Sequence, residues 1–443
     1  MIKPEFTKNI LVLMSGTTIA QAIPIAISPI LTRIYTPEDF GVLAIFVSIV
    51  TILSIIVTGT YDMAIILPKK DSDALYVILL SCIITFFISL LSLIIVFMFN
   101  EQIASFLGDE SIRIWLYFVP VSIFLTGIFQ NMNYWLNRHK YYKSISKSRI
   151  VQSGVTSSTQ LLMGLAGQLS SGLILGRVFG QLVSTAIIVK SFLSKRKKIL
   201  LKRKKVKMIA LAKRYKKFPL YESWANLLNT SSTEVPVILI SSLFSVGITG
   251  FYILANRMLL LPMTLIGSSI GQVFFQEASK IKSNTDELRS LTFSIYKKLV
   301  MIGTFPISVV IIYGDVIFAF VFGEAWKVSG EFAQVLGVWI LFVFISSPLS
   351  NILIVLEKQK ESLIFNLVIF LSRISSIIIG FVFFEDVYYT ILLFGVTGAV
   401  FWLFWYSYIL NLANIRFSIA LLELLKYFIP SICILTLAKV LLF

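Results

Sequence analysis

Three arginines lie well inside long apolar segments of the sequence, at Arg177, Arg257 and Arg373. An ionised side chain at mid-membrane depth costs at least about 2.5–3.5 kcal/mol on insertion scales, so such residues usually face water, an acid or a ligand. The planar guanidinium group binds phosphate oxygens through two parallel hydrogen bonds. These arginines therefore predict a binding site for an anionic, phosphate-bearing ligand.

Amides and hydroxyls accompany the arginines at helical spacing. Gln152, Thr156 and Gln160 recur every four residues, which places them on one side of a helix. Such neutral groups bind hydroxyl-rich ligands, although isolated Ser and Thr side chains more often form hydrogen bonds between helices. The amides that we predict to contact a ligand are Gln21, Gln152, Gln160, Gln181, Asn226 and Asn229.

Three carboxylates, Asp62, Glu222 and Glu234, also fall within or beside the apolar segments. Each could neutralise an arginine, or bind a proton or cation whose gradient drives transport. Asp62 and Glu222 lie toward the ends of their segments, which also fits a position at the membrane surface. Glu234 lies deeper.

The sequence lacks the residues for catalysis or metal binding. Cys82 and Cys433 both fall within apolar segments, and the single histidine, His139, lies in a basic loop. No disulfide framework, zinc cluster or histidine-dependent triad can be built from them, and no Walker A sequence occurs. We therefore expect no enzyme activity, no metal, no cofactor and no direct use of ATP.

The elements that must position these residues are membrane-spanning helices. Hydrophobic residues make up 57% of the 443-residue chain and charged residues 14%, which is far from soluble proteins. The first apolar run has no cleavage site, so we expect it to span rather than to act as a signal peptide. The sequence predicts an all-α polytopic membrane protein with twelve spans, at 9–31, 40–67, 74–98, 113–136, 148–166, 171–193, 219–243, 247–275, 291–321, 332–357, 361–384 and 388–411. The stretch 427–443 is either a thirteenth span or an amphipathic tail.

The connections alternate in charge, which predicts the orientation. The odd-numbered connections hold only Arg33, Arg113 and Lys327 as basic residues, whereas the even-numbered ones and both flanks are basic. By the positive-inside rule the N-terminus is cytoplasmic. The most basic stretch, 195–217, is predicted to lie against anionic headgroups rather than to bind nucleic acid. The predicted parts are an N-terminal six-helix lobe (1–193), a basic cytoplasmic connector (194–218), a C-terminal six-helix lobe (219–411) and an apolar tail or extra helix (412–443).

The stretch 29–41, which reads PILTRIYTPEDFG, resembles the Wzx-type polysaccharide biosynthesis flippases of the MOP exporter superfamily. The segment 247–257 with Pro262, followed by 274–279, resembles the eighth helix of that family. The first motif is the more specific, and the twelve-span layout extends the likeness over nearly the whole chain.

The resemblance implies a V-shaped bundle of two lobes around a central cavity, which opens alternately to each side of the bacterial cytoplasmic membrane. It implies transport of an undecaprenyl-diphosphate-linked oligosaccharide repeat unit for O-antigen, capsule or exopolysaccharide. Arg33 carries over directly as a substrate-binding residue, and Arg257 less securely. The expected partners are the lipid-linked oligosaccharide, membrane lipids and a coupling H⁺ or Na⁺, with a polysaccharide polymerase and a chain-length regulator as further candidates.

Three alternatives stay open at this point. A multidrug antiporter of the same superfamily should have a cavity dominated by acids, whereas the deep charges here are mainly basic. Only the 29–41 motif favours a polysaccharide flippase over a peptidoglycan-precursor flippase. A membrane polysaccharide polymerase or ligase should carry a large external loop with titratable groups, and the predicted external loops are short.

Overall fold

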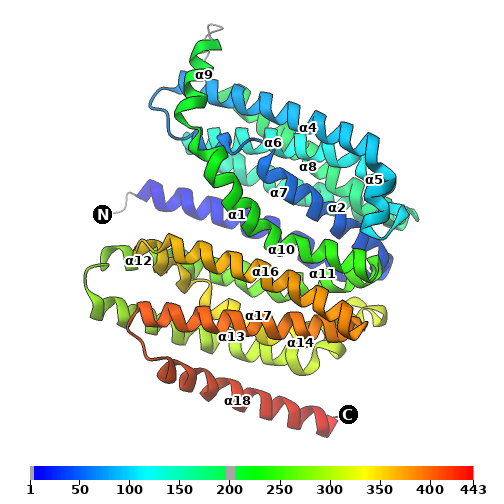
Figure 1. The fold of residues 1–443 in the computed structure, drawn as a ribbon, viewed down its shortest axis with the longest axis vertical. Helices are drawn as coiled ribbons and strands as arrows, with labels where there is room; N and C mark the ends of the chain where they lie inside the picture. The colour runs from blue at the N-terminus through cyan, green and yellow to red at the C-terminus, as the bar shows by residue number, and fades with distance from the viewer. Residues whose placement is uncertain (1–3, 196–204, 443) are drawn as a thin grey trace. The chain divides into compact units, whose positions relative to one another are not determined.

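The structure is a computed structural model that describes residues 4–195 and 205–442. Within these ranges helices follow one another through short turns, and no strand occurs. The chain forms two compact units, Met1–Gly247 and Ile248–Phe443. Figure 1 shows the first unit in blue to green and the second in green to red. Each unit is a bundle of long helices.

The first unit contains α1 to α10. Their bounds are α1 (Pro4–Ile34), α2 (Pro37–Ile56), α3 (Tyr61–Ala64), α4 (Asp71–Leu107), α5 (Arg113–Leu116), α6 (Phe118–Arg138), α7 (Tyr142–Leu165), α8 (Leu169–Lys195), α9 (Lys205–Arg214) and α10 (Ser223–Leu243). A π-helix, η2 (Phe218–Glu222), leads into α10. Helix α7 packs against α1 and α8, and α2 packs against α10.

The second unit contains α11 to α18. Their bounds are α11 (Val246–Pro262), α12 (Ser268–Lys280), α13 (Thr285–Phe322), α14 (Lys327–Ser346), α15 (Ile352–Val355), α16 (Gln359–Phe384), α17 (Val387–Leu412) and α18 (Phe417–Leu442). A π-helix, η3 (Met263–Gly267), joins α11 to α12. Helix α14 packs against α13 and α17, and α18 packs against α13.

The helices confirm the predicted class of an all-α polytopic membrane protein. In the described part of the chain nine helices are long and apolar enough to span a membrane, and the pair α5 and α6, bent by 44°, adds a tenth. Helices α7 and α10 are 24 and 21 residues long but carry too many polar side chains to pass the same test. Helix α11, at 17 residues, is shorter. The last apolar stretch forms one helix from Phe417, and it passes the test as a further span.

Three predicted spans are interrupted. The span 113–136 bends between α5 and α6, and the span 332–357 is interrupted after α14, before α15. The third is 40–67. The apolar run 40–67 was expected to be continuous, but α2 ends at Ile56 and the chain turns before α3. Gly59 and Thr60 both adopt left-handed backbone angles, with φ of 58° and 53°. A β-branched residue in this region is strained, so the surrounding packing must hold Thr60 in place. Its hydroxyl is buried and lies 2.7 Å from the hydroxyl of Ser223.

Helix α10 belongs to the first compact unit, although it follows the basic connector in sequence. Ser241 donates a hydrogen bond to the carbonyl of Leu107 at 2.7 Å, and Ser48 on α2 donates to Glu234 at 2.7 Å. The start of α2 also packs tightly on the chain just after α10, because a Cβ atom at Gly41 would overlap the backbone of Val246. The division into two six-helix lobes stays a prediction.

Candidate functional site

A polar pocket of about 280 Å³ lies inside the first unit, among α2, α6, α7 and α8. It brings together three of the predicted ligand-binding residues, Gln152, Arg177 and Gln181. Its lining residues are Phe46, Val47, Val50, Thr51, Ser54, Ile55, Thr126, Phe129, Gln130, Gln152, Arg177, Gln181 and Ser184. Those of α6, α7 and α8 lie in the middle part of their helices, whereas those of α2 extend to its last turn.

Glycines on α8 bring Arg177 close to α7. A Cβ atom at Gly176 would lie 2.6 Å from Cγ of Gln160, and one at Gly180 would lie 2.8 Å from the carbonyl oxygen of Gln152 and overlap the hydroxyl of Thr156. Glycines four residues apart allow two helix backbones to approach closely in a membrane. Arg177 follows Gly176 on α8 and lines the pocket together with Gln152 of α7.

The polar groups of the pocket differ in whether they have hydrogen-bond partners. Gln181 donates to the carbonyl of Ser122 at 2.9 Å and to the hydroxyl of Thr126, so α6 fixes its orientation. The Ser54 hydroxyl is buried and has no hydrogen-bond partner among the described residues. Arg177 is exposed, and within residues 4–195 and 205–442 it forms no ion pair or hydrogen bond. The pocket thus presents an uncompensated cation beside free donors.

The other amides have different surroundings. Gln160 is buried between α7 and α8, where its amide donates to the carbonyl of Leu173 at 3.0 Å, so it holds two helices together. Gln21 on α1 and Asn229 on α10 are exposed, and Asn226 is half-buried. None of these four lines the pocket around Arg177.

The two deep arginines of the second unit are placed differently. Arg373 on α16 is 8% exposed, and its guanidinium lies 5.0 Å from the ring centroid of Trp339, a distance typical of a cation–π contact. Arg257 on α11 is exposed. Another pocket, of about 460 Å³, lies in this second unit along α12. Its polar lining groups are neutral and include Ser268, Gln272 and Asn351.

The three acids lie in different places and differ in their exposure to solvent. Asp62 is 5% exposed beside the break after α2, and it accepts a hydrogen bond from Thr58 at 2.7 Å. Glu234 is half-buried and accepts from Ser48. Glu222 is exposed at the start of α10. No cluster of three His, Cys, Asp or Glu side chains that could hold a metal occurs among the described residues.

The 29–41 motif closes the turn between α1 and α2. Thr36 accepts a hydrogen bond from the backbone N–H of Asp39 at 3.3 Å, and Asp39 accepts from the N–H of Thr36 at 2.9 Å, which is a reciprocal capping box with proline at the first helical position. Tyr35 is buried and donates to the carbonyl of Gln160 at 2.6 Å. Burial, with the nearby Asp39 carboxylate, raises the pKa of Tyr35 to about 12, so it remains a donor at neutral pH. Arg33 is exposed and donates to the carbonyl of Pro29.

Residues 30–331 match the family model described as "Polysaccharide biosynthesis protein". The chain belongs to this polysaccharide biosynthesis family. The lipopolysaccharide biosynthesis protein WzxC of Escherichia coli strain K12 is 25% identical over 159 residues, which cover 35% of this chain and 32% of WzxC. The aligned part therefore spans about a third of that relative.

Solved transporters share the fold of this polysaccharide biosynthesis protein. The lipid II flippase MurJ, in an inward closed conformation, superposes with a TM-score of 0.73 at 15% identity, over 98% of this chain and 93% of MurJ. An inward-facing multidrug resistance MATE transporter of the MOP superfamily gives 0.67 at 14% identity, over 91% and 98%. An outward-facing form of a MATE transporter gives 0.59 at 14% identity, over 93% and 94%. These likenesses establish a MOP-type fold.

Sequence reasoning missed three polar residues of this family member. Gln130 and Ser54 line the pocket. Ser54 has Thr51 and Thr58 at helical spacing, and Gln130 has Thr126, so the same spacing argument could have found both. Arg149 on α7 donates to the hydroxyl of Thr17 on α1 at 3.3 Å. Arg149 lies three residues before Gln152, so the polar stripe of α7 could have been extended to include it.

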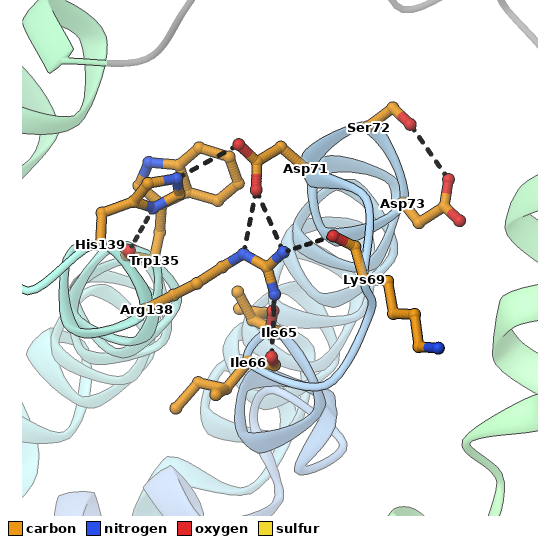
Figure 2. Close-up of polar contacts among 9 residues, drawn as sticks. All are labelled: Ile65, Ile66, Lys69, Asp71, Ser72, Asp73, Trp135, Arg138 and His139. Atoms are coloured by element: carbon orange, nitrogen blue, oxygen red, sulfur yellow. Dashed lines mark hydrogen bonds and ion pairs between the residues drawn. The ribbon is translucent and has the colours of Figure 1, made fainter.

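A further polar cluster joins the ends of α4 and α6, and Figure 2 shows its contacts. Arg138 donates to one carboxylate oxygen of Asp71 through both Nε and Nη2 at 3.1 Å, and to the carbonyl of Ile66 at 2.8 Å. His139 lies 3.3 Å from the other Asp71 oxygen, and its Nδ1 lies 3.1 Å from the carbonyl of Trp135. Arg138 therefore holds the turn between α3 and α4 against α6.

Replacing Arg138 by alanine is expected to lower the free energy of unfolding by about 1 kcal/mol, because Asp71 is partly exposed and water replaces part of the interaction. Hydrogen exchange of residues 65–70 should become faster in the same variant. The matched control is Lys69→Ala, which removes a charge from the same turn but leaves the Lys69 carbonyl, to which Arg138 donates at 3.4 Å. Equal effects of both substitutions would show that the Arg138 contacts contribute nothing.

Proposed function

We propose that this protein is a flippase that moves an undecaprenyl-diphosphate-linked oligosaccharide repeat unit from the inner to the outer leaflet of the bacterial cytoplasmic membrane, for assembly of a surface polysaccharide. Membership of the polysaccharide biosynthesis family and the MOP-type fold support this proposal. The observation that carries it is the polar pocket around Arg177, at a depth where an unpaired cation is costly unless it meets an anionic ligand.

The substrate's chemistry matches the residues available. A diphosphate suits arginine, sugar hydroxyls suit the amide and hydroxyl side chains, and the polyprenyl tail can remain in lipid. Transport breaks no bond, so the protein needs no nucleophile or metal and is proposed not to be an enzyme. Alternating access is supported by the inward-facing and outward-facing transporters that share this fold.

We propose that energy enters through an ion gradient rather than ATP. Among the three acids, Asp62 is the first candidate for binding H⁺ or Na⁺, because it is a buried carboxylate beside a broken helix. Glu234 is half-buried and Glu222 exposed, so they rank second and third. A polymerase and a chain-length regulator remain expected partners.

Purified protein in liposomes that contain a fluorescent undecaprenyl-diphosphate oligosaccharide provides the test. We expect loss of inner-leaflet label at a rate that depends on the protein and rises under a pH or sodium gradient, with the gradient effect absent in Asp62→Asn. Empty liposomes and the organic cation ethidium serve as controls. Transport of ethidium instead of the oligosaccharide would support an antiporter, and preference for lipid II would support a peptidoglycan-precursor flippase. Product longer than the supplied repeat unit would indicate a polymerase.

The charge pattern predicts the orientation of the chain in the membrane. Reporters fused after Lys147 and Lys282 are expected in the cytoplasm, and reporters after Asp109 and Glu331 outside. Because α18 is long and apolar enough for a further crossing, a C-terminal reporter is expected outside. Alkaline phosphatase and green fluorescent protein fusions report the two sides independently. Two reversed reporters in one unit would contradict the orientation.

A further inference from the structure

A groove runs between α16 and α17, two neighbouring helices of the second unit that Figure 1 shows side by side. It has a volume of about 370 Å³, and each helix lines it with four side chains at the spacing of one helical face. Phe365 and Trp405 stack with their ring centroids 4.0 Å apart, and Trp405 is buried. Ile364 and Phe404 are 52% and 68% exposed. A stacked aromatic floor therefore lies between two apolar rims.

The position of the groove indicates a hydrocarbon chain as its occupant. Both helices are long and apolar enough to span a membrane, where exposed rims such as Ile364 and Phe404 are surrounded by hydrocarbon rather than water. On α16 the lining extends from Glu361 to Val368, which is about two helical turns or 10 Å. The volume of about 370 Å³ is at the low end for ligand sites, so the groove holds a segment of one chain rather than a whole lipid.

One end of the groove carries charge. Glu361 is the one charged side chain that lines it in the described part of the protein. Its carboxylate lies 3.3 Å from Nζ of Lys358, and Lys360 is exposed beside it. Because α17 returns antiparallel to α16, Tyr408 lies at the same end, and its hydroxyl forms no hydrogen bond with another described residue. A carboxylate, two ammonium groups and a phenolic hydroxyl thus surround this end.

These groups suit a headgroup that carries both signs of charge. A carboxylate binds an ammonium group, whereas lysines and a tyrosine hydroxyl bind phosphate oxygens. A lipid with phosphate alone would place its negative charge beside Glu361, which is unfavourable. The chemistry therefore favours a phospholipid with an amine in its headgroup over a polyprenyl diphosphate, which carries only negative charge.

We propose that the groove between α16 and α17 binds one phospholipid whose headgroup contains an amine, with an acyl chain on Phe365 and Trp405 and the ammonium on Glu361. The charge pattern of the chain predicts that the start of α16 is cytoplasmic, so the lipid belongs to the cytoplasmic leaflet. The site is independent of the pocket around Arg177 and of the proposed transport function. A lipid bound there contacts two helices and stabilises the folded protein by mass action.

Native mass spectrometry and thermal shift of the purified full chain in mild detergent test the site, with phosphatidylethanolamine and phosphatidylglycerol that have identical acyl chains. We expect one phosphatidylethanolamine per chain, a raised melting temperature, and phosphatidylglycerol binding that is about fivefold weaker, as for a partly exposed ion pair. Glu361→Gln should remove this preference. Undecaprenyl phosphate is the third lipid, and its tighter binding would assign the groove to a lipid carrier and overturn the amine-bearing occupant.

Ile364→Trp should abolish retention of phosphatidylethanolamine, because the larger ring fills the groove from its exposed rim and replaces no buried side chain. Ile94→Trp makes the same change at a 47% exposed position of α4 and should bind the lipid like the wild type. Val368→Phe fills the other end of the groove and replaces Ile364→Trp if that variant does not fold. Equal retention of both phospholipids by the wild type, or wild-type binding in the groove-filling variants, would overturn the site.

Discussion

Arg177→Ala is expected to reduce oligosaccharide flipping in liposomes by about 10–100-fold, while folded protein remains near the wild-type amount. The loss corresponds to a hydrogen-bonded charge interaction of about 1.5–3 kcal/mol with the ligand. Folding should tolerate the change because Arg177 has no partner among the described residues. Arg177→Lys should recover only part of the rate, because an ammonium group lacks the planar pair of donors.

Two other arginines serve as comparisons for Arg177. Arg289→Ala should leave the flipping rate unchanged, since Arg289 is exposed on α13. Arg373→Ala should instead reduce the amount of folded protein, because it removes a buried side chain that covers Trp339. The measurement combines initial flipping rates with size-exclusion profiles of the purified variants. Loss of folded protein in Arg177→Ala as well would mean that Arg177 stabilises the helix bundle.

Gly180→Ala is expected to lower the free energy of unfolding by about 1–3 kcal/mol, the usual cost of adding a methyl group to a closely packed site. The added carbon would overlap the Thr156 hydroxyl and lie 2.8 Å from the Gln152 carbonyl oxygen, so α7 and α8 must move apart. Because Gln152 and Arg177 lie on these two helices and line one pocket, the flipping rate in liposomes should fall together with stability. Denaturation in detergent and initial flipping rates measure the two effects.

Gly154→Ala is the matched control on α7. No atom outside its own helical turn lies within 4 Å of a Cβ atom at Gly154, so the substitution should be neutral or stabilise the helix by up to about 1 kcal/mol. If both variants lose stability equally, the cause is helix-wide and the close contact between α7 and α8 is not responsible.

The class of fold could be predicted from apolar length alone, and it is confirmed. Among the described helices that are long enough to span, α7 and α10 fail the test for apolar composition. They carry Gln152, Gln160, Asn226 and Asn229, four of the amides that the sequence analysis singled out. The break between α2 and α3 could not be predicted, because the run 40–67 reads as continuously apolar. The left-handed angles of Gly59 and Thr60 depend on tertiary contacts such as that with Ser223.

The candidate site could be predicted only in part. Side chains four residues apart on a helix differ by about 40° in direction, so Gln152 and Gln160 diverge by about 80° over two steps. Gln152 consequently lines the pocket, whereas Gln160 bonds across to α8. Periodicity identifies one side of a helix, but only packing decides which neighbour or space that side meets.

The motif that carried the family resemblance also has a structural explanation. Thr36, Pro37 and Asp39 start α2 through a capping box, and Tyr35 ties the turn to α7. Such local features are readable from sequence as a helix start. They account for the residue types in the motif without any contact to a ligand, so the substrate-binding role expected for Arg33 stays a prediction.

The assignment of α10 to the first unit has a consequence for dividing the gene. If the chain is expressed as two pieces that separate within the basic stretch, the second piece carries α10, whose partners Leu107 and Ser48 remain on the first. The two products should therefore reassemble into a complex that survives purification. A division after Gly247 would instead leave every contact of α10 with α2 inside one polypeptide, which makes that point the better boundary for producing the first unit alone.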